Sequence, residues 1–209
     1  AHEIKNPLTP MRLSVQSFER RFDPSDPKIN EKVKEYSNTL IQQIDTMSSI
    51  ASAFSSYADM PAQKNEMLNV VKISKLALDI FNEKYIYFFA KEEEIIAKLD
   101  RAQLIRIITN LVKNSLHAIK QIQPETPLVE VNVFSEGTSV CITVSDNGVG
   151  IPEAYKEKVF EPKFTTKTSG MGLGLAMVKN IVETYQGEIL FTSEENKGTT
   201  FTVKFPRET

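Results

Sequence analysis

The stretches D-N-G-V-G at Asp146–Gly150 and G-M-G-L-G-L at Gly170–Leu175 are the most informative part of this chain. The first follows a strand-like run at Val140–Val144, and the second opens a helix-like run at Ala176–Tyr185. Glycine lets the backbone approach a phosphate closely, and a helix that begins after such a loop offers free N–H groups to an anion. Each cluster alone also fits an ordinary glycine-rich turn, so the neighbouring segments must decide between a turn and a phosphate-binding site.

A predicted helix at Arg101–Lys120 carries two asparagines one turn apart. Asn110 and Asn114 are separated by four residues and therefore project from one helix face, and His117 extends the row. Amide oxygens are hard ligands that can hold Mg²⁺ beside phosphates. A solvated helix face would explain the same residues without any chemistry. The helical period itself is set by Leu104, Ile108, Leu111, Val112, Ser115 and Ile119.

The segment F-E-P-K-F-T-T-K-T at Phe160–Thr168 combines aromatic residues, hydroxyls and two lysines. A flexible loop of this composition could cover bound phosphates, and an ordinary surface loop is the alternative. In their order and spacing, these four segments resemble the N, G1, F and G2 boxes of the histidine-kinase ATPase domain. The resemblance extends over roughly Leu68–Phe205.

The resemblance implies a Bergerat-type α/β sandwich, in which helices cover one face of a mixed sheet and ATP lies under a mobile lid. It implies that Asn114 holds Mg²⁺, that Asn110 supports the phosphate side and that Asp146 reads adenine. The other residues that it places at the nucleotide are His117, Gly148, Gly150, Phe160, Thr166, Lys167, Gly170, Gly172, Leu173 and Gly174.

The chain opens with A-H-E-I-K-N-P-L-T-P, which places His2, Glu3 and Asn6 on one outward helical patch. A histidine on such a face is commonly only surface. Here Glu3 could orient the imidazole or accept its proton, and Asn6 could position a water. The second histidine of a zinc-protease H-E-x-x-H motif is absent. The segment resembles instead the H-E-x-x-N phospho-acceptor motif of histidine kinases.

Two heptad patterns, within Ile4–Phe22 and Ile29–Tyr57, flank the turn signal D-P-S-D-P. An amphipathic helical hairpin that packs on a neighbouring element would explain these patterns without any catalytic role. A lone hairpin, however, leaves its apolar stripe in water, at about 1.5–3 kcal/mol for each large side chain. Two hairpins that form a four-helix bundle would bury both stripes, so we expect a homodimer through Ile4–Tyr57.

The expected organisation is α+β, with a dimerisation and phosphotransfer hairpin at 1–58, a linker at 59–66 and an ATP-binding domain at 67–209. Within the last, we expect a helix over Lys75–Asn82. The expected strands are Asn69–Ile73, Tyr85–Ala90, Glu94–Leu99, Val129–Phe134, Val140–Val144, Glu188–Thr192 and Thr199–Phe205.

Composition excludes some classes of partner. A net charge of −2 argues against nucleic acid or an anionic membrane as an electrostatic partner. Cys141 is the single cysteine, so the chain holds no disulfide framework and a cytoplasmic location fits. No apolar run approaches the roughly 20 residues of a membrane span. Because the chain starts almost at His2, we expect a fragment of a longer sensor.

The resemblance implies an ATP-dependent kinase that phosphorylates His2 and passes the group to an aspartate of a response regulator, with reverse phosphatase activity. H-E-I-K-N-P-L with F-T-T-K favours a nitrogen-regulation-like sensor.

One alternative is a topoisomerase-like or chaperone-like ATPase that hydrolyses ATP with water. By resemblance those carry a glutamate base one turn before the magnesium asparagine, where this chain has Asn110. The other is a phosphatase-only or non-enzymatic dimer that uses ATP as a conformational ligand.

Overall fold

The computed structural model describes residues 2–58, 64–162 and 172–207, and the side chains at 2–10, 21, 42 and 45–58 lie outside this description. The chain divides into two compact units, with the boundary between Met60 and Pro61. Among the described residues, no helix is both long and apolar enough to cross a membrane.

The N-terminal unit is a helical hairpin of α1 (His2–Arg21) and α2 (Ile29–Ala58). The predicted turn between them is confirmed, because Asp23 accepts the backbone N–H of Ser25 at 2.9 Å and Asp26 accepts that of Lys28 at 2.8 Å. In each of these Asx turns the aspartate side chain pairs the backbone N–H two residues further on, and both turns lie between the end of α1 and the start of α2. The helices meet through Phe18 and Tyr36, whose rings stack with centroids 4.3 Å apart.

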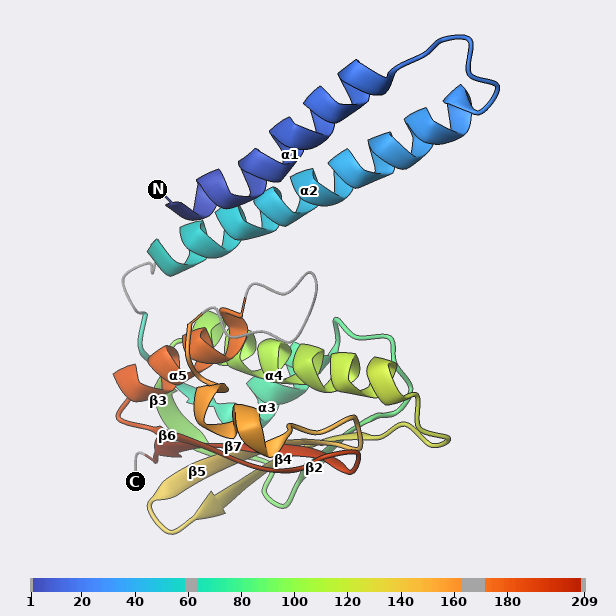
Figure 1. Ribbon diagram of the computed structural model, residues 1–209. Coiled ribbons are helices and arrows are strands. Elements are labelled where there is room, and N and C mark those ends of the chain that lie inside the picture. The colour runs from blue at the N-terminus through green and yellow to red at the C-terminus, as the bar shows by residue number, and fades with distance from the viewer. Residues whose placement is uncertain (1, 59–63, 163–171, 208–209) are drawn as a thin grey trace. The chain divides into compact units, whose positions relative to one another are not determined.

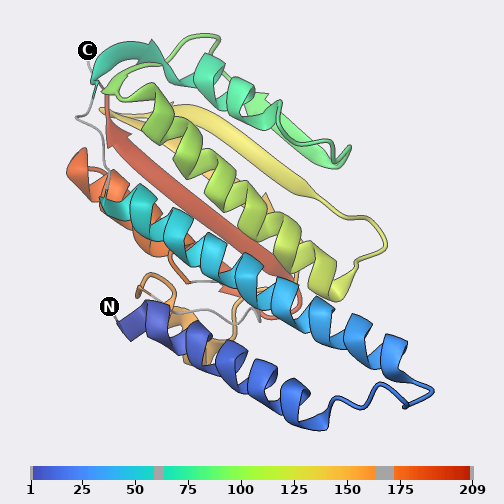
Figure 2. The ribbon, with the colours of Figure 1, turned by 90° about the horizontal axis from the view of Figure 1, so that it is seen from above.

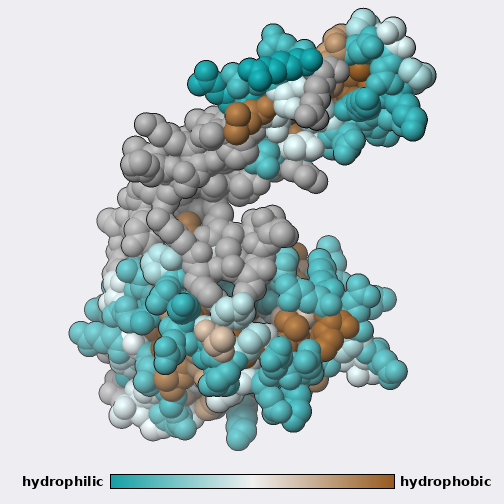
Figure 3. Space-filling view, in the orientation of Figure 1, coloured by the Kyte–Doolittle hydropathy of each residue, from teal (hydrophilic) through white to brown (hydrophobic). Residues whose placement is uncertain are grey.

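Much of the hairpin's apolar surface stays open. Figure 3 shows hydrophobic residues among hydrophilic ones on the described part of the hairpin. Phe18, Tyr36 and Leu40 of the predicted heptads are half-buried between the helices. The large apolar side chains that remain exposed there are Leu13, Val15, Phe22, Val33, Ile41 and Ile44. One copy of the hairpin therefore does not bury its own apolar stripe.

The C-terminal unit is a two-layer α/β sandwich, as the sequence predicts. A mixed five-stranded sheet has the order β2-β4-β5-β7-β6, with β2 parallel to β4 and the other pairs antiparallel. Three helices lie across one face of this sheet (Figures 1 and 2). The sheet strands are β2 (Ile86–Ala90), β4 (Val129–Glu136), β5 (Ser139–Asp146), β6 (Glu188–Glu194) and β7 (Gly198–Pro206).

The covering helices are α3 (Val70–Leu78), α4 (Arg101–Ile122) and α5 (Gly174–Thr184), and a short 3₁₀ helix spans Glu153–Lys158. A small antiparallel ladder of β1 (Glu66–Asn69) and β3 (Ile96–Leu99) precedes α4. The predicted apolar face of α4 is confirmed, since all six residues that set its period are buried. Helix α4 contacts β4 and β5, whose alternate residues on one face of the sheet are also buried: Val129, Val131, Val133, Val140, Ile142 and Val144.

The expected strand at Asn69–Ile73 is wrong. The strand ends at Asn69, whose side chain accepts the N–H groups of Val71 and Lys72 at 3.0 and 3.2 Å and so starts helix α3. The β-branched run Val70–Ile73 favours a strand locally. The asparagine cap and the burial of Val70 and Ile73 outweigh that preference.

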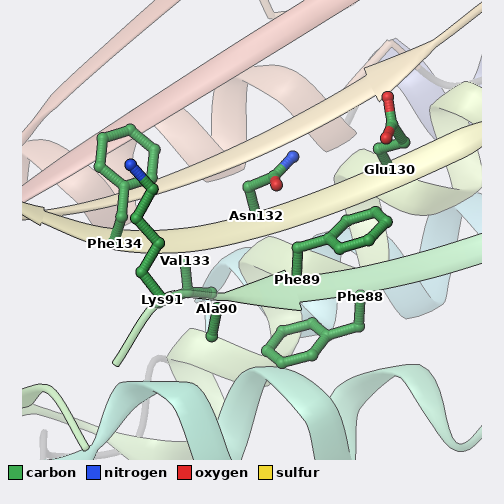
Figure 4. A pocket seen from close by; sticks show the side chains of 8 residues that line it. All are labelled: Phe88, Phe89, Ala90, Lys91, Glu130, Asn132, Val133 and Phe134. Carbon is green, nitrogen blue, oxygen red and sulfur yellow. The ribbon is translucent and has the colours of Figure 1, made fainter. Parts of the chain in front are cut away.

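A hollow lies at the β2–β4 edge of the sheet (Figure 4). In that view Phe89, Asn132 and Phe134 project from one side of the strands and Phe88 from the other. Glu130, which also lines the hollow, alternates with Val129, the buried register partner of Asp146. Because successive side chains alternate between faces, this hollow lies on the face opposite Asp146.

Candidate nucleotide-binding site

Helix α4, which covers one face of the sheet, carries the two asparagines. Asp100 caps the helix, and both Asn110 and Asn114 are half-buried, as is His117. The Asn110 side-chain N–H donates to the Arg106 carbonyl at 2.8 Å, which leaves its oxygen directed elsewhere. A Cβ built on Gly174 would lie only 3.1 Å from that oxygen. Asn110 therefore meets the start of α5, although it lies more than 60 residues from Gly174 in the sequence.

Asp146 ends β5 on the face that the helices cover. It pairs in register with the buried Val129, and its carboxylate accepts the N–H of Gly148 at 3.0 Å. Burial raises the pKa of Asp146, against the opposing effect of the Ser115 hydroxyl and the N–H groups of Gly148 and Thr199. A partly desolvated acceptor of this kind suits the amino group of a buried base.

The Gly148–Gly150 turn is wedged between α4 and the β6–β7 hairpin. A Cβ on Gly148 would lie 2.5 Å from the Ala118 Cβ, and the Val149 N–H donates to the Ala118 carbonyl at 3.2 Å. On the other side, the Val149 carbonyl accepts the N–H of Asn196 at 2.7 Å. Glycine is required here because a larger residue would push the turn off the helix.

The second glycine cluster is described only in part. Gly172 has a φ of +63°, Leu173 occupies the N-cap position and Gly174 begins α5. Among the described residues, no side chain forms a capping hydrogen bond to the N–H groups of the first turn of α5. The predicted site residues Thr166, Lys167 and Gly170 lie outside the described residues.

Phe160 lies at the start of the predicted phosphate-covering loop and packs on the sheet. Its ring meets those of Phe191 and Phe201 edge-on at 5.8 and 6.4 Å. Lys179 of α5 lies over the same ring, with its Nζ 5.8 Å from the centroid. These contacts anchor Phe160, just after the 3₁₀ helix at Glu153–Lys158, to strands β6 and β7.

Comparisons with known proteins agree with this geometry. Residues 99–209 match the family described as histidine kinase-, DNA gyrase B- and HSP90-like ATPase, and residues 1–63 match the His kinase A (phospho-acceptor) domain. The chain belongs to the sensor histidine kinases. Membership of the ATPase family identifies ATP as the ligand of the C-terminal unit.

Its relatives place this histidine kinase in the NtrY-like subgroup. It is 30% identical to the nitrogen regulation protein NtrY of Azorhizobium caulinodans over 95% of this chain and 27% of that protein. It is 33% identical to a putative NtrY-like sensor histidine kinase of Rickettsia conorii over 98% of this chain and 34% of that one. The chain thus spans about a third or less of the length of these relatives.

The likeness to solved structures extends to the whole of this chain. The histidine kinase ThkA, in complex with the response regulator protein TrrA, matches with a TM-score of 0.73 and 25% identity over 100% of this chain and 60% of that one. A likeness over the whole length is informative because it includes the hairpin as well as the sandwich. The predicted fold class is confirmed.

Sequence reasoning missed three polar residues around Asp146. Ser115 counted only as part of the apolar period of α4, yet it is buried and its hydroxyl opposes the rise that burial causes in the pKa of Asp146. Thr199, which is 5% exposed, shares a 2.8 Å hydrogen bond with Ser193 beside the same carboxylate. Ser193 and Thr199 lie in the β6–β7 hairpin, more than 40 residues from Asp146, and no local sequence signal connects them with that carboxylate.

The described residues fit a magnesium nucleotide. No group of three or more His, Cys, Asp or Glu side chains able to hold a metal occurs among them. Mg²⁺ commonly takes one or two protein oxygens and completes its shell with waters and phosphate oxygens. A single amide oxygen from α4 is consistent with that chemistry, and the glycine turn after Asp146 leaves no room for a Cβ between Gly148 and Ala118 of α4.

Proposed function

We propose that this chain is the kinase core of a two-component sensor. It transfers the γ-phosphoryl group of ATP to His2 and then passes that group to an aspartate of a response regulator. The observation that carries the proposal is the convergence of Asn110 on Gly174, the first residue of α5, with Asp146 held beneath the same helix α4. The match of residues 1–63 to the phospho-acceptor domain supports His2 as the acceptor.

The nucleotide contacts follow from this arrangement. Asp146 would accept a hydrogen bond from the adenine amino group, and the Gly148–Gly150 turn would hold the base against α4. Asn114 would be the protein ligand of Mg²⁺, which when bound neutralises phosphate charge. Asn110 and the start of α5 would contact the phosphate side. His117, Thr166, Lys167 and Gly170 would contribute further phosphate contacts, and Phe160 would act through its packing on β6 and β7.

In the transfer step, a ring nitrogen of His2 attacks the γ-phosphorus of ATP. A nitrogen–phosphorus bond forms, the bond to the β,γ-bridging oxygen breaks, and ADP leaves with the electron pair. Glu3 takes the proton that the imidazole loses. The protein supplies in-line positioning and charge neutralisation more than covalent chemistry. Asn6 would position the water that hydrolyses the regulator's aspartyl phosphate in the reverse activity.

The proposed organisation is a homodimer. Residues 1–58 form the dimerisation and phosphotransfer hairpin, 59–66 the linker and 67–209 the ATP-binding domain. The open apolar side chains of α1 and α2, such as Val15 and Ile44, support a second hairpin as their cover. The regulator partner is supported by ThkA, whose structure is a complex with a response regulator. A cytoplasmic location stays a prediction.

Labelling with γ-³²P-ATP and magnesium tests the acceptor. The expected label survives base, is lost in acid, and vanishes in His2→Gln. The chain holds only two histidines, so mapping the labelled peptide decides between His2 and His117. Label that persists on His2→Gln contradicts the proposal.

The same reaction separates the kinase from an ATPase that uses water. Asn110 stands where such enzymes carry a glutamate base, so we expect slow phosphate release compared with labelling. Release of phosphate in large excess over label, with His2 unmodified, would favour hydrolysis. Tight nucleotide binding without either reaction would favour a dimer that uses ATP as a conformational ligand.

A further inference from the structure

The end of the linker is fastened to the C-terminal unit by a small polar cluster. The Lys64 backbone N–H donates to Asp100 Oδ2 at 2.9 Å. The Tyr185 hydroxyl donates to Asn65 Oδ1 at 3.0 Å and accepts the Asp100 N–H at 3.2 Å. We call these four residues the linker clasp. It joins segments that lie 36, 85 and 120 residues apart in sequence.

The linker clasp contacts both helices of the nucleotide site, α4 through Asp100 and α5 through Tyr185. Asp100 is the N-cap of α4, and its other oxygen accepts the N–H groups of Ala102 and Gln103 at 2.8 and 3.1 Å. Burial acts to raise the pKa of Asp100, but the N–H groups of Lys64, Gln103 and Ala102 hold it below its usual value. The carboxylate that starts the asparagine helix therefore also holds the linker.

Tyr185 supplies the connection to α5. It is the residue at which that helix ends, and its ring packs edge-on against Phe205 with centroids 6.1 Å apart. The ring is thus fixed by the core, which leaves the hydroxyl at a defined position. Immediately after Asn65, strand β1 begins its ladder with β3, the strand that leads into Asp100. The linker is therefore bound by side chains and by a backbone ladder at one place.

We propose that Tyr185 is a positioning residue for phosphoryl transfer. Its hydroxyl, together with Asp100, fixes the point at which the linker leaves the ATP-binding unit relative to α4 and α5. This inference rests on the proposed function: a linker held in this way would make it more probable that the hairpin presents His2 to ATP. Orientation of two reactants raises a rate without changing the affinity for either. Tyr185 touches neither reactant.

The decisive variant is Tyr185→Phe, which removes the hydroxyl and keeps the ring against Phe205. We expect the rate of His2 labelling at saturating ATP to fall about fivefold, the effect of losing an ordinary hydrogen bond. The KM for ATP and the Kd for ADP should stay within about twofold, since Tyr185 lies at the opposite end of α5 from Gly174, and Asp100 lies more than about three helical turns before Asn114. Asn65→Ala should give the same loss, and the double variant no further loss.

Tyr87→Phe is the matched control, because it makes the same chemical change at an exposed position of β2. It should leave the rate and the KM unchanged. An unchanged rate in Tyr185→Phe overturns the proposal. So does a rise in the ADP Kd as large as the loss in kcat/KM, because that result would place the effect in the nucleotide site.

A second measurement keeps the inference separate from the proposed function. If the wild-type chain does not label, the proposed function fails, and amide hydrogen exchange then judges the clasp. In the wild type, ADP should slow exchange of the Lys64 amide, which donates to Asp100. In Tyr185→Phe that amide should exchange faster and respond less to ADP. No difference between the two proteins at Lys64 overturns the clasp as a positioning device.

Discussion

The helical hairpin and the ATP-binding unit bury their apolar residues in different ways. In the hairpin, Val15, Phe22 and Ile44 remain about half exposed. In the ATP-binding unit, the sheet and its three helices enclose side chains such as Leu111 and Ile142 completely. A sheet face and several helices can close a core within one chain, whereas two helices cannot. The sandwich closes its own core, and we propose that the hairpin needs a second copy to cover these exposed side chains.

The largest effect that separates the two units should come from Gly198→Ala. Gly198 has a φ of +123°, and a Cβ there would collide with the carbonyl oxygen of Asp146. Both strain and overlap would push β7 away from β5, and we expect the ATP-binding unit to lose about 3 kcal/mol or more of unfolding free energy. Urea denaturation followed by circular dichroism measures this loss. The dimerisation constant of the hairpin should not change.

Gly137→Ala is the control for Gly198→Ala. Gly137 has a similar left-handed backbone, with a φ of +59°, but nothing within 4 Å of the added Cβ. Its cost should be about 1 kcal/mol, the conformational penalty alone. Equal losses at the two glycines would show that the packing around Asp146 is looser than described.

A smaller effect, confined to the hairpin, is expected of Ile44→Glu. Ile44 is 50% exposed in one copy and lies on the heptad seam that we assign to the dimer. Placing a charge there should raise the dimer dissociation constant at least tenfold, because about 1.5–3 kcal/mol is lost for each large apolar side chain. Sedimentation equilibrium measures the constant.

Leu190→Glu matches that change in the other unit, since Leu190 is 46% exposed on β6. It should leave the dimerisation constant unaltered. If the two variants weaken dimerisation equally, the loss follows from any charge placed at an exposed apolar position, and the proposed difference between the two units is wrong.

The smallest effect concerns pH and Asp146. Because burial raises the pKa of Asp146 in the folded state, its contribution to stability is greatest below the ordinary value of 3.8 and is lost as pH rises through the folded-state pKa. Asp146→Asn removes this cost, so the variant should gain stability relative to wild type as pH rises from 3 towards about 7. Urea denaturation across this range measures the difference.

The exposed Asp79, at the end of α3, provides the matched Asp→Asn control for the loss of one charge. A relative stability of Asp146→Asn that falls with rising pH would mean that hydrogen bonds to the carboxylate outweigh its burial. At neutral pH the same variant should bind ADP more weakly, which isothermal calorimetry can measure.

Several elements were predictable because their signals are local. The period of α4, the D-P-S-D-P turn between α1 and α2, and the strands at Val129–Phe134 and Val140–Val144 each depend on residues within a few positions of one another. The error at Asn69–Ile73 arose where two local preferences compete. A β-branched run favoured a strand, and the asparagine before it favoured a helix start. The outcome depended on the burial of Val70 and Ile73, which sequence alone does not report.

The site divides in the same way. Asn110, Asn114, Asp146 and the glycines could be selected from their order and type, because each motif is contiguous in the chain. The contributions of Ser115, Thr199 and Tyr185 could not be selected. Each acts on a partner that is distant in sequence and reaches it only when β5, β7 and the two helices pack.

The amino-acid sequence by itself determined the family, the α/β sandwich, the helical hairpin and the residue types that we propose bind a magnesium nucleotide. Tertiary structure decided which helix face meets α5, why glycine is needed at Gly148 and Gly198, and how the linker is held at Asp100. The physical reason is range. Helical period, capping and turn chemistry act over a few residues, whereas burial, close backbone approach and the pKa of Asp146 depend on segments that only the folded chain brings together.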